Sequence, residues 1–250
     1  MDEETLIGYH GTSKCNCRDI IKNGFKASRA QEGHWLGTGV YFYENIYSAI
    51  EWGIIRFLFG NNNYNLYREK CSVIKGILNC KKYEVLDLND PLGYEIYQEI
   101  LKNIQERFPN TIEKINNGKD VEIIRLLEEV ESKTGENYIS MFDVITADYP
   151  KNIYNKKPEN IWGNFLPCIQ KQICVKNDNV IEKYEEVDID KENGQTYFQV
   201  ITKNREEYKN EKQSRIVKKT ARENKKYSRR YNWKCNRKFK WKNEIRRLWI

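Results

Sequence analysis

The sequence has few histidines, no closely spaced cysteine pair of the zinc-binding type and no long apolar run. Only two of its 250 residues are histidine, and its seven cysteines include no Cys-x-x-Cys pair. A structural zinc site needs four ligands at short spacings, so we expect no metal centre. The chain has no run of 18 apolar residues, and its acidic start lacks the basic and apolar regions of a signal peptide. We therefore expect a cytoplasmic protein with reduced thiols and no membrane partner.

Positive charge is concentrated near one end of the chain. Residues 201–250 contain 19 lysine and arginine residues against 5 acidic ones, whereas residues 1–200 contain 24 against 31. This shift predicts a mildly acidic globular domain over residues 1–200 and a basic extension over residues 201–250. Hydrophobic residues make up 39% of the chain, which is enough to form a large core.

Aromatic residues are interleaved with basic residues in the basic extension. Cations bind phosphates and aromatic rings stack on bases, so the extension favours single-stranded DNA or RNA as a partner. An acidic protein partner, such as an antitoxin, fits the same charge almost as well, and many charge runs are only solvated or disordered ends. The aromatic residues concerned are Tyr227, Tyr231, Trp233, Phe239 and Trp241.

Strand-like and helix-like segments follow one another irregularly over residues 1–200. Strands are expected near 5–10, 40–44, 71–78, 82–88, 138–146, 167–177 and 180–189, of which 138–146 also suits a buried helix. Helices are expected near 13–24, 45–59, 94–107 and 119–133. The order lacks the regular strand–helix–strand repeat of a parallel sheet, so it predicts an α+β fold.

A histidine stands where the first strand should end. His10 is followed by Gly11, which lets a ligand approach the backbone closely. Taken alone, His10 is more simply a core histidine that satisfies a buried hydrogen bond. The stretch 37–43 is equally ambiguous, because a Gly-x-Gly turn before alternating aromatics also describes an ordinary strand. No Gly-Lys-Ser/Thr follows this stretch, so it does not form a phosphate-binding P-loop.

The order and spacing of these motifs make them more specific together than apart. Along the chain they are Tyr9-His10-Gly11-Thr12, Asn23-Gly24-Phe25-Lys26, Gly37-Thr38-Gly39-Val40-Tyr41-Phe42, and Trp52 eleven residues after Tyr41. The arrangement resembles the ADP-ribosyltransferase superfamily, in its poly(ADP-ribose)-polymerase-like branch with a His-Tyr-Glu triad, and especially its bacterial or phage members. The resemblance covers residues 6–53 and a last motif at 171–175, whereas residues 60–160 do not align.

The resemblance implies both a fold and a set of residue roles. The fold would be the α+β ADP-ribosyltransferase fold, in which two packed, mainly antiparallel sheets form an NAD cleft with flanking helices. His10 would orient the ribose on the nicotinamide side, and the backbone of Gly11, next to Thr12 of the same NAD-binding motif, would pair with the nicotinamide amide. Tyr41 and Trp52 would stack on the nicotinamide ring. NAD is then a substrate, and no metal is needed.

Two positions depart from the family pattern. Ala49, next to Ser48, stands where a serine often contacts the nicotinamide amide, and Gln172 stands where the triad has glutamate. Glutamine keeps a hydrogen bond but carries no charge to offset an oxocarbenium-like state or to accept a proton. Some bacterial members also have glutamine here. We therefore expect single transfer rather than chain elongation, to a nucleophilic acceptor or with another base such as Glu44.

These features predict a mono-ADP-ribosyltransferase that cleaves NAD, releases nicotinamide and modifies a macromolecule. The expected acceptor is a nucleic acid or a nucleic-acid-associated protein, and the expected biological role is that of a toxin or defence effector. A weak or non-catalytic NAD-sensing or nucleic-acid-binding module is the first alternative, because Gln172 would then mark lost chemistry. An NAD-dependent RNA 2′-phosphotransferase is the second, but the arginine-rich site of that branch is not evident in the sequence.

Overall fold

The computed structural model describes residues 3–27, 36–58, 62–109, 123–150 and 169–203, together with four single positions between 206 and 213. The chain divides into two compact units, Met1–Val200 and Ile201–Ile250. Nearly all of the second unit, including the five aromatic residues of the basic extension, lies outside the described residues. The expectations for that extension therefore rest on the sequence alone.

The first unit is an α+β fold, as predicted. Its strands are β1 (Glu3–Ser13), β2 (Val40–Tyr43), β3 (Cys71–Lys81), β4 (Val85–Asp87), β5 (Val144–Pro150), β6 (Ile169–Val175) and β7 (Ile181–Glu186). Its helices are α1 (Lys14–Asn23), α2 (Ile46–Phe57), α3 (Tyr64–Lys70), α4 (Pro91–Arg107) and α6 (Ile123–Thr134). A further helix covers residues 194–200 at the end of this unit. Among the helices that the structure describes, none combines the length and the apolar character required to cross a membrane.

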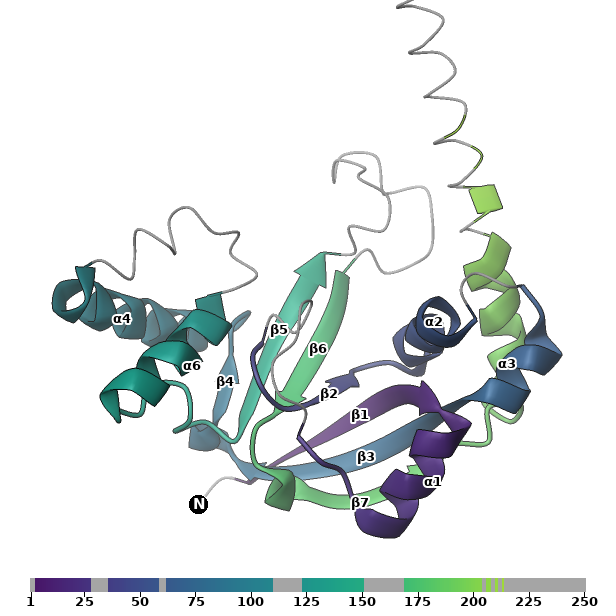
Figure 1. Cartoon of the computed structure of the whole chain (residues 1–250), viewed down its shortest axis with the longest axis horizontal. Coiled ribbons are helices and arrows are strands. Elements are labelled where there is room, and N and C mark those ends of the chain that lie inside the picture. The colour runs from purple at the N-terminus through teal and green to yellow at the C-terminus, as the bar shows by residue number, and fades with distance from the viewer. Residues whose placement is uncertain are drawn as a thin grey trace, which may run out of the picture. The chain divides into compact units, whose positions relative to one another are not determined.

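The seven strands form one sheet with the order β4-β5-β6-β2-β1-β3-β7 (Figure 1). Its neighbouring strands are antiparallel except for β4 and β5. The expectation of two packed sheets is therefore wrong for the described residues. The reason is the short strand β2, which pairs with β6 along its full length and also reaches β1.

The sheet is nearly divided at the junction of β1 and β2. These strands pair only where Tyr9 lies opposite Tyr43, whereas β1 and β3 pair continuously from Glu3 to Ser13 of β1. In Figure 1, β5 and β6 run steeply across the direction of β1 and β3. A strong twist between neighbouring strands separates their backbones away from the point of contact. The junction is thus a place where a cavity can open between two halves of one sheet.

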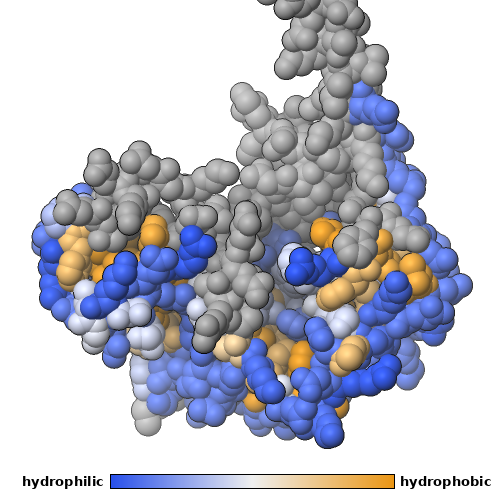
Figure 2. Space-filling view, viewed as in Figure 1, coloured by the Kyte–Doolittle hydropathy of each residue, from blue (hydrophilic) through white to orange (hydrophobic). Residues whose placement is uncertain are grey.

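Buried side chains cover both faces of this sheet. Successive residues of β6 alternate between two core clusters, with Cys174 in one and Ile173 in the other. The cluster of Cys174 includes Ile104 of α4 and Leu127 of α6, whereas the cluster of Ile173 includes Cys17 of α1. On the face shown in Figure 2, apolar residues also gather at the surface over α2 and over α4 and α6. The helices are therefore anchored by apolar packing on both sides of the strands.

The first two helices begin at the caps that the sequence predicts. The Ser13 hydroxyl accepts a hydrogen bond from Asn16 N at 3.1 Å, and Gly24 follows the end of α1 with φ of 82°. The Asn45 side chain accepts one from Ser48 N at 2.9 Å at the start of α2. Such caps satisfy amides that have no partner within the helix. They set where both helices begin, and Trp52 of α2 lies at a cavity that residues of β1 and β2 also line.

The helix α3 does not follow from the sequence interpretation. The asparagine-rich stretch at 61–65 predicts only the end of the preceding helix, and that helix ends earlier, at Phe57. Asn63 instead caps α3, because its side chain accepts a hydrogen bond from Leu66 N at 3.1 Å. Asparagine is as favourable before a helix as in a loop, so the pattern did not distinguish the two.

Candidate functional site

The structure brings the six predicted site residues to one cavity. This cavity has a volume of about 340 Å³ and lies beside the junction of β1 and β2. Cavities that bind small molecules are typically about 300–1,000 Å³. Its lining includes His10, Gly11 and Thr12 from β1, Tyr41 from β2, Trp52 from α2 and Gln172 from β6. Four separate elements therefore converge on one cavity, and β6 is far from the other three in the sequence.

The remaining walls of this aromatic cavity come from nearby segments. They are formed by Asn16, Asp19 and Ile20 of α1, by Gly24, Phe25 and Lys26 after it, and by Gly39, Val40 and Tyr43 around β2. Most of the wall is aromatic, aliphatic or neutral and polar, and only one carboxylate and one ammonium group join it. Such a lining suits a flat organic molecule that is held by a few directed hydrogen bonds.

His10 joins the two strands that separate beside the cavity. Its Nδ1 lies 2.7 Å from the carbonyl oxygen of Tyr41. A carbonyl only accepts, so Nδ1 donates this hydrogen bond and Nε2 of the neutral ring is an acceptor. Burial lowers the pKa of His10 from its usual value, and the hydrogen bond to Tyr41 opposes this only in part. At neutral pH the ring is therefore uncharged, and its Nε2 can accept a hydrogen bond from a hydroxyl group of a ligand.

Two aromatic rings fix the orientation of the His10 imidazole. The ring centroid of Phe25 lies 5.4 Å away and that of Phe42 lies 5.9 Å away, both in edge-on arrangements. Such arrangements are the favourable ones for aromatic pairs. The sequence left open whether His10 is a core histidine or a ligand-facing one, and the structure gives it features of both. It makes a satisfied internal hydrogen bond, and it also lines the cavity.

Tyr41 is held from both ends. Its carbonyl oxygen accepts from His10, and its hydroxyl donates to the carbonyl of Gly37 at 2.9 Å. The ring is half-buried against the core cluster of α4 and α6, and burial raises the pKa of its hydroxyl, which stays neutral. The ring of Tyr41 is thus fixed and uncharged, and Tyr41 is one of the residues that line the cavity.

Gln172 and Trp52 occupy different parts of the cavity. Gln172 is half-buried in the middle of β6, opposite Tyr43 of β2 and Ala147 of β5. Trp52 is 40% exposed on α2, so its ring lies where the cavity meets solvent. The amide of Gln172 lies on the sheet, whereas the ring of Trp52 lies at the opening of the cavity. This arrangement is consistent with a ligand that enters beside α2.

Tyr43 is a lining residue that the sequence interpretation did not single out. It lies directly opposite Gln172, its side chain hydrogen-bonds with Gln170, and burial raises the pKa of its hydroxyl. The signal for it is present in the sequence, because Tyr41 and Tyr43 are two residues apart on one strand and therefore share a face. Glu44, the alternative base named from the sequence, is exposed and is not among the residues that line the cavity.

Gly11 has a packing role that the sequence did not reveal. A Cβ atom at this position would lie 2.1 Å from the carbonyl oxygen of Ala49 on α2. Glycine therefore allows α2 to approach β1 closely, besides leaving its own backbone accessible to a ligand. Ala49 and Ser48 are 0% and 1% exposed and do not line the cavity. The contact with Gly11 involves only the backbone of Ala49, so it does not depend on the alanine side chain.

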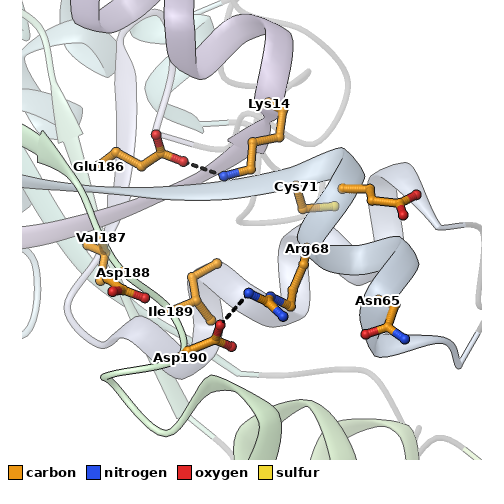
Figure 3. A pocket seen from close by; sticks show the side chains of 10 residues that line it. Lys14, Asn65, Arg68, Cys71, Glu186, Val187, Asp188, Ile189 and Asp190 are labelled. Carbon is orange, nitrogen blue, oxygen red and sulfur yellow. Dashed lines mark hydrogen bonds and ion pairs between the residues drawn. The ribbon is translucent and has the colours of Figure 1, made fainter.

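A larger hollow, of about 710 Å³, lies beside Lys14 at the start of α1 (Figure 3). Its wall is formed by Lys14, Asn65, Arg68, Glu69, Cys71, Glu186, Val187, Asp188, Ile189 and Asp190. Lys14 pairs with Glu186 at 2.5 Å and Arg68 pairs with Asp190 at 2.6 Å, as the dashed lines show. This charged hollow contains none of the predicted site residues and no aromatic ring, so the smaller cavity is the better candidate site.

The described cysteines and acids form no metal centre. Cys15, Cys17, Cys71, Cys80 and Cys174 are free thiols. Over the ranges that the structure describes, no three histidine, cysteine, aspartate or glutamate side chains are grouped as metal ligands.

Comparison with known proteins gives one relative over most of the chain. The sequence is 26% identical over 199 residues to an uncharacterised protein of Methanocaldococcus jannaschii, which covers 73% of this chain and 87% of that protein. No family model matches the chain, and no solved structure matches it. The relative's name assigns no activity, so an argument for function depends on the aromatic cavity and its residues.

Proposed function

We propose that this protein is an NAD-dependent mono-ADP-ribosyltransferase with the fold of the poly(ADP-ribose)-polymerase-like branch. The observation that carries the proposal is the shared cavity of His10, Gly11, Tyr41, Trp52 and Gln172. These residues were selected by their order and spacing in the sequence, yet they come from four separate elements. The resemblance implies an NAD cleft between two packed sheets, whereas here the cavity lies beside the single Tyr9–Tyr43 pairing that joins β1 and β2 in one sheet.

The side chains of the cavity suit the nicotinamide riboside part of NAD. In this proposal, the rings of Tyr41 and Trp52 stack on the nicotinamide, and the backbone of Gly11 pairs with its amide. Nε2 of the neutral His10 accepts a hydrogen bond from a ribose hydroxyl. The rings of Phe25 and Phe42 already fix the imidazole, so little rotational freedom is lost when the substrate binds.

The reaction breaks the bond between ribose C1′ and the nicotinamide nitrogen. The electron pair of that bond leaves with nicotinamide, and C1′ passes through an oxocarbenium-like state. A nucleophilic atom of the acceptor then bonds to C1′, and its proton passes to water. Gln172 can hydrogen-bond a ribose hydroxyl but cannot offset the positive charge. The chain thus contributes binding and orientation, which favours a single transfer to an acceptor that is already nucleophilic.

The proposed acceptor is a nucleic acid or a protein bound to one, and the proposed role is that of a toxin or defence effector. This part of the proposal is supported by the charge and aromatic content of residues 201–250. Binding of RNA or DNA by the full chain should then weaken steeply as salt concentration rises, because phosphate contacts release counterions.

The test is an incubation of the purified protein with a whole-cell extract and NAD labelled on its adenosine side. We expect label on a macromolecule and an equal release of nicotinamide, neither of which occurs without the extract. Treating the extract beforehand with nuclease or with protease identifies the class of acceptor. NAD binding with neither labelling nor nicotinamide release would instead support a non-catalytic NAD-binding module, the alternative that Gln172 favours.

A further inference from the structure

Hydrogen bonds connect α6 to the turn that precedes β2. The Glu128 carboxylate accepts from the backbone N–H of Thr38 at 2.8 and 3.0 Å and from its hydroxyl at 3.2 Å. Lys176, directly after β6, pairs with Glu128 and also donates to the carbonyl of Leu36 at 2.7 Å. The turn at 36–38 is therefore held at both ends by one partly buried ion pair.

The turn is shaped to receive this carboxylate. Gly37 has φ of 81°, and a Cβ atom there would lie 2.2 Å from Oε1 of Glu128. Both the backbone conformation and the close approach therefore require glycine. The side chains of Lys176 and Glu128 are only 11% and 20% exposed, so solvent screens their hydrogen bonds weakly. Charge-assisted hydrogen bonds of this kind are stronger than those between neutral groups.

The same turn holds the central tyrosine of the aromatic cavity. The carbonyl of Gly37 accepts the hydroxyl proton of Tyr41, and the carbonyl of Tyr41 accepts the Nδ1 proton of His10. A continuous series of contacts thus runs from Glu128 through the turn to Tyr41 and on to His10. It links a helix outside the recognised motifs to two residues of the candidate site.

Apolar packing already holds α6 on the sheet without Glu128. Ile124, Leu127 and Val130 of this helix are buried in the core cluster that contains Ile145 and Cys174. Removing the charge of Glu128 should therefore leave the helix in place and weaken only its contacts with the turn. The contribution of Glu128 is local to the segment before β2.

We infer that Glu128 is a positioning residue of the candidate site. It fixes the turn at 36–38, the turn fixes Tyr41, and Tyr41 fixes His10. The inference rests on the proposed function, because it takes Tyr41 and His10 as the groups that hold the nicotinamide riboside part of NAD.

The test compares Glu128→Gln with Glu129→Gln, which makes the same chemical change at an exposed site on the same helix. The first readout is the ring nitrogen NMR spectrum of His10. The chain has only two histidines, so a His34→Gln variant assigns the signals. The second readout is the Kd for NAD by titration calorimetry. We expect Glu128→Gln to shift the His10 signals and to raise the Kd about tenfold, the factor for one charge-assisted hydrogen bond. Glu129→Gln should change neither.

The outcomes separate this inference from the proposed function. Unchanged His10 signals in Glu128→Gln overturn the inference, whatever happens to NAD binding. Shifted signals with an unchanged Kd also overturn it, because the turn would then have no effect on the bound substrate. If the unmodified protein binds no NAD, the proposed function fails, and the His10 signals alone decide whether Glu128 acts on the site.

A second variant covers the case in which Glu128→Gln does not fold. Thr38→Val removes one of the hydrogen bonds to Glu128 and keeps the backbone amide and the shape of the side chain. We expect a shift of the His10 signals in the same direction but of smaller size. An unchanged spectrum in this variant counts against the inference in the same way.

Discussion

Residues of α1 line two hollows, which differ in chemistry more than in size. The charged hollow is about twice as large as the aromatic cavity, at about 710 against 340 Å³. Its two cations are paired with Glu186 and Asp190, and these acids accept further hydrogen bonds from Ser72 and Tyr64 at 2.7 Å. The aromatic cavity instead presents rings, an imidazole acceptor and an amide.

This difference shows that volume alone is a poor guide to the site. Groups that are already paired have little to gain from a ligand, because binding must first break their existing contacts. An aromatic face or a neutral imidazole nitrogen loses only water when a ligand arrives. The residues of the smaller cavity therefore have more to gain from a ligand than the paired ions of the larger hollow.

The largest effect is expected from adding a carboxylate to the aromatic cavity. Gln172→Glu places a charge beside the ribose, where it can offset the oxocarbenium-like state and accept a proton. We expect nicotinamide release to rise about 100-fold, at the low end of what general acid–base catalysis contributes. The measurement is the initial rate of nicotinamide release by chromatography.

The matched control is Asn65→Asp, which makes the same change of amide to carboxylate in the charged hollow. It should leave the rate unchanged. A rate that is the same for Gln172→Glu and for the unmodified protein would contradict the position assigned to Gln172 at the reaction centre.

The next largest effect is expected from removing the ring at the rim. Trp52→Ala should raise the Kd for NAD about 10- to 100-fold, because stacking on an aromatic side chain contributes about 1–3 kcal/mol. Since Trp52 is 40% exposed, the melting temperature should change little. Calorimetric titration and thermal unfolding measure the two quantities. Asn65→Ala in the charged hollow is the control, and equal losses of affinity in both variants would remove the distinction between the hollows.

Most of the site residues that the sequence predicted are close together in the chain, and Gln172 is the distant one. His10, Tyr41 and Trp52 lie within 43 consecutive positions, so their order and spacing were visible as a pattern. Glu128 contacts Thr38 across 90 positions, and the apolar pattern of α6 predicts only which side of that helix is buried. The same limit applies to the sheet, because the pairing of Tyr9 with Tyr43 depends on tertiary contacts and not on alternation along either strand.

A third prediction concerns the pH at which folding stability is lost, which should differ between a group of the aromatic cavity and a group of the charged hollow. Burial holds the pKa of His10 below its unfolded value of 6.5, so the unfolded chain takes up a proton first as pH falls. Stability is therefore lost from about pH 6.5 down to the folded pKa. Hydrogen bonds from Lys14 and Ser72 hold the pKa of Glu186 below 4.5, so its contribution is lost only in more acidic solution.

Urea unfolding of the unmodified protein and of His10→Gln between pH 8 and 5 tests this difference. The stability of His10→Gln should fall less between pH 6.5 and 5 than that of the unmodified protein. The affinity of the unmodified protein for NAD should fall only as pH approaches the lowered folded pKa of His10, where Nε2 gains a proton and can no longer accept. Identical pH profiles for the two proteins would show that His10 does not titrate with folding.

The smallest effect is expected from an ion pair of the charged hollow. Lys14 and Glu186 are 35% and 39% exposed, and water screens a pair at that depth strongly. Such pairs contribute about 0–1 kcal/mol, so Lys14→Met should change the free energy of unfolding by less than about 1 kcal/mol. It should also leave the Kd for NAD unchanged, because Lys14 does not line the aromatic cavity. Urea unfolding at low and high salt, with Lys14→Arg as the charge-preserving control, measures the first quantity. A loss above about 2 kcal/mol would mean that the charged hollow is a rigid, poorly hydrated site, and it would then compete with the aromatic cavity as the place where this protein binds its ligand.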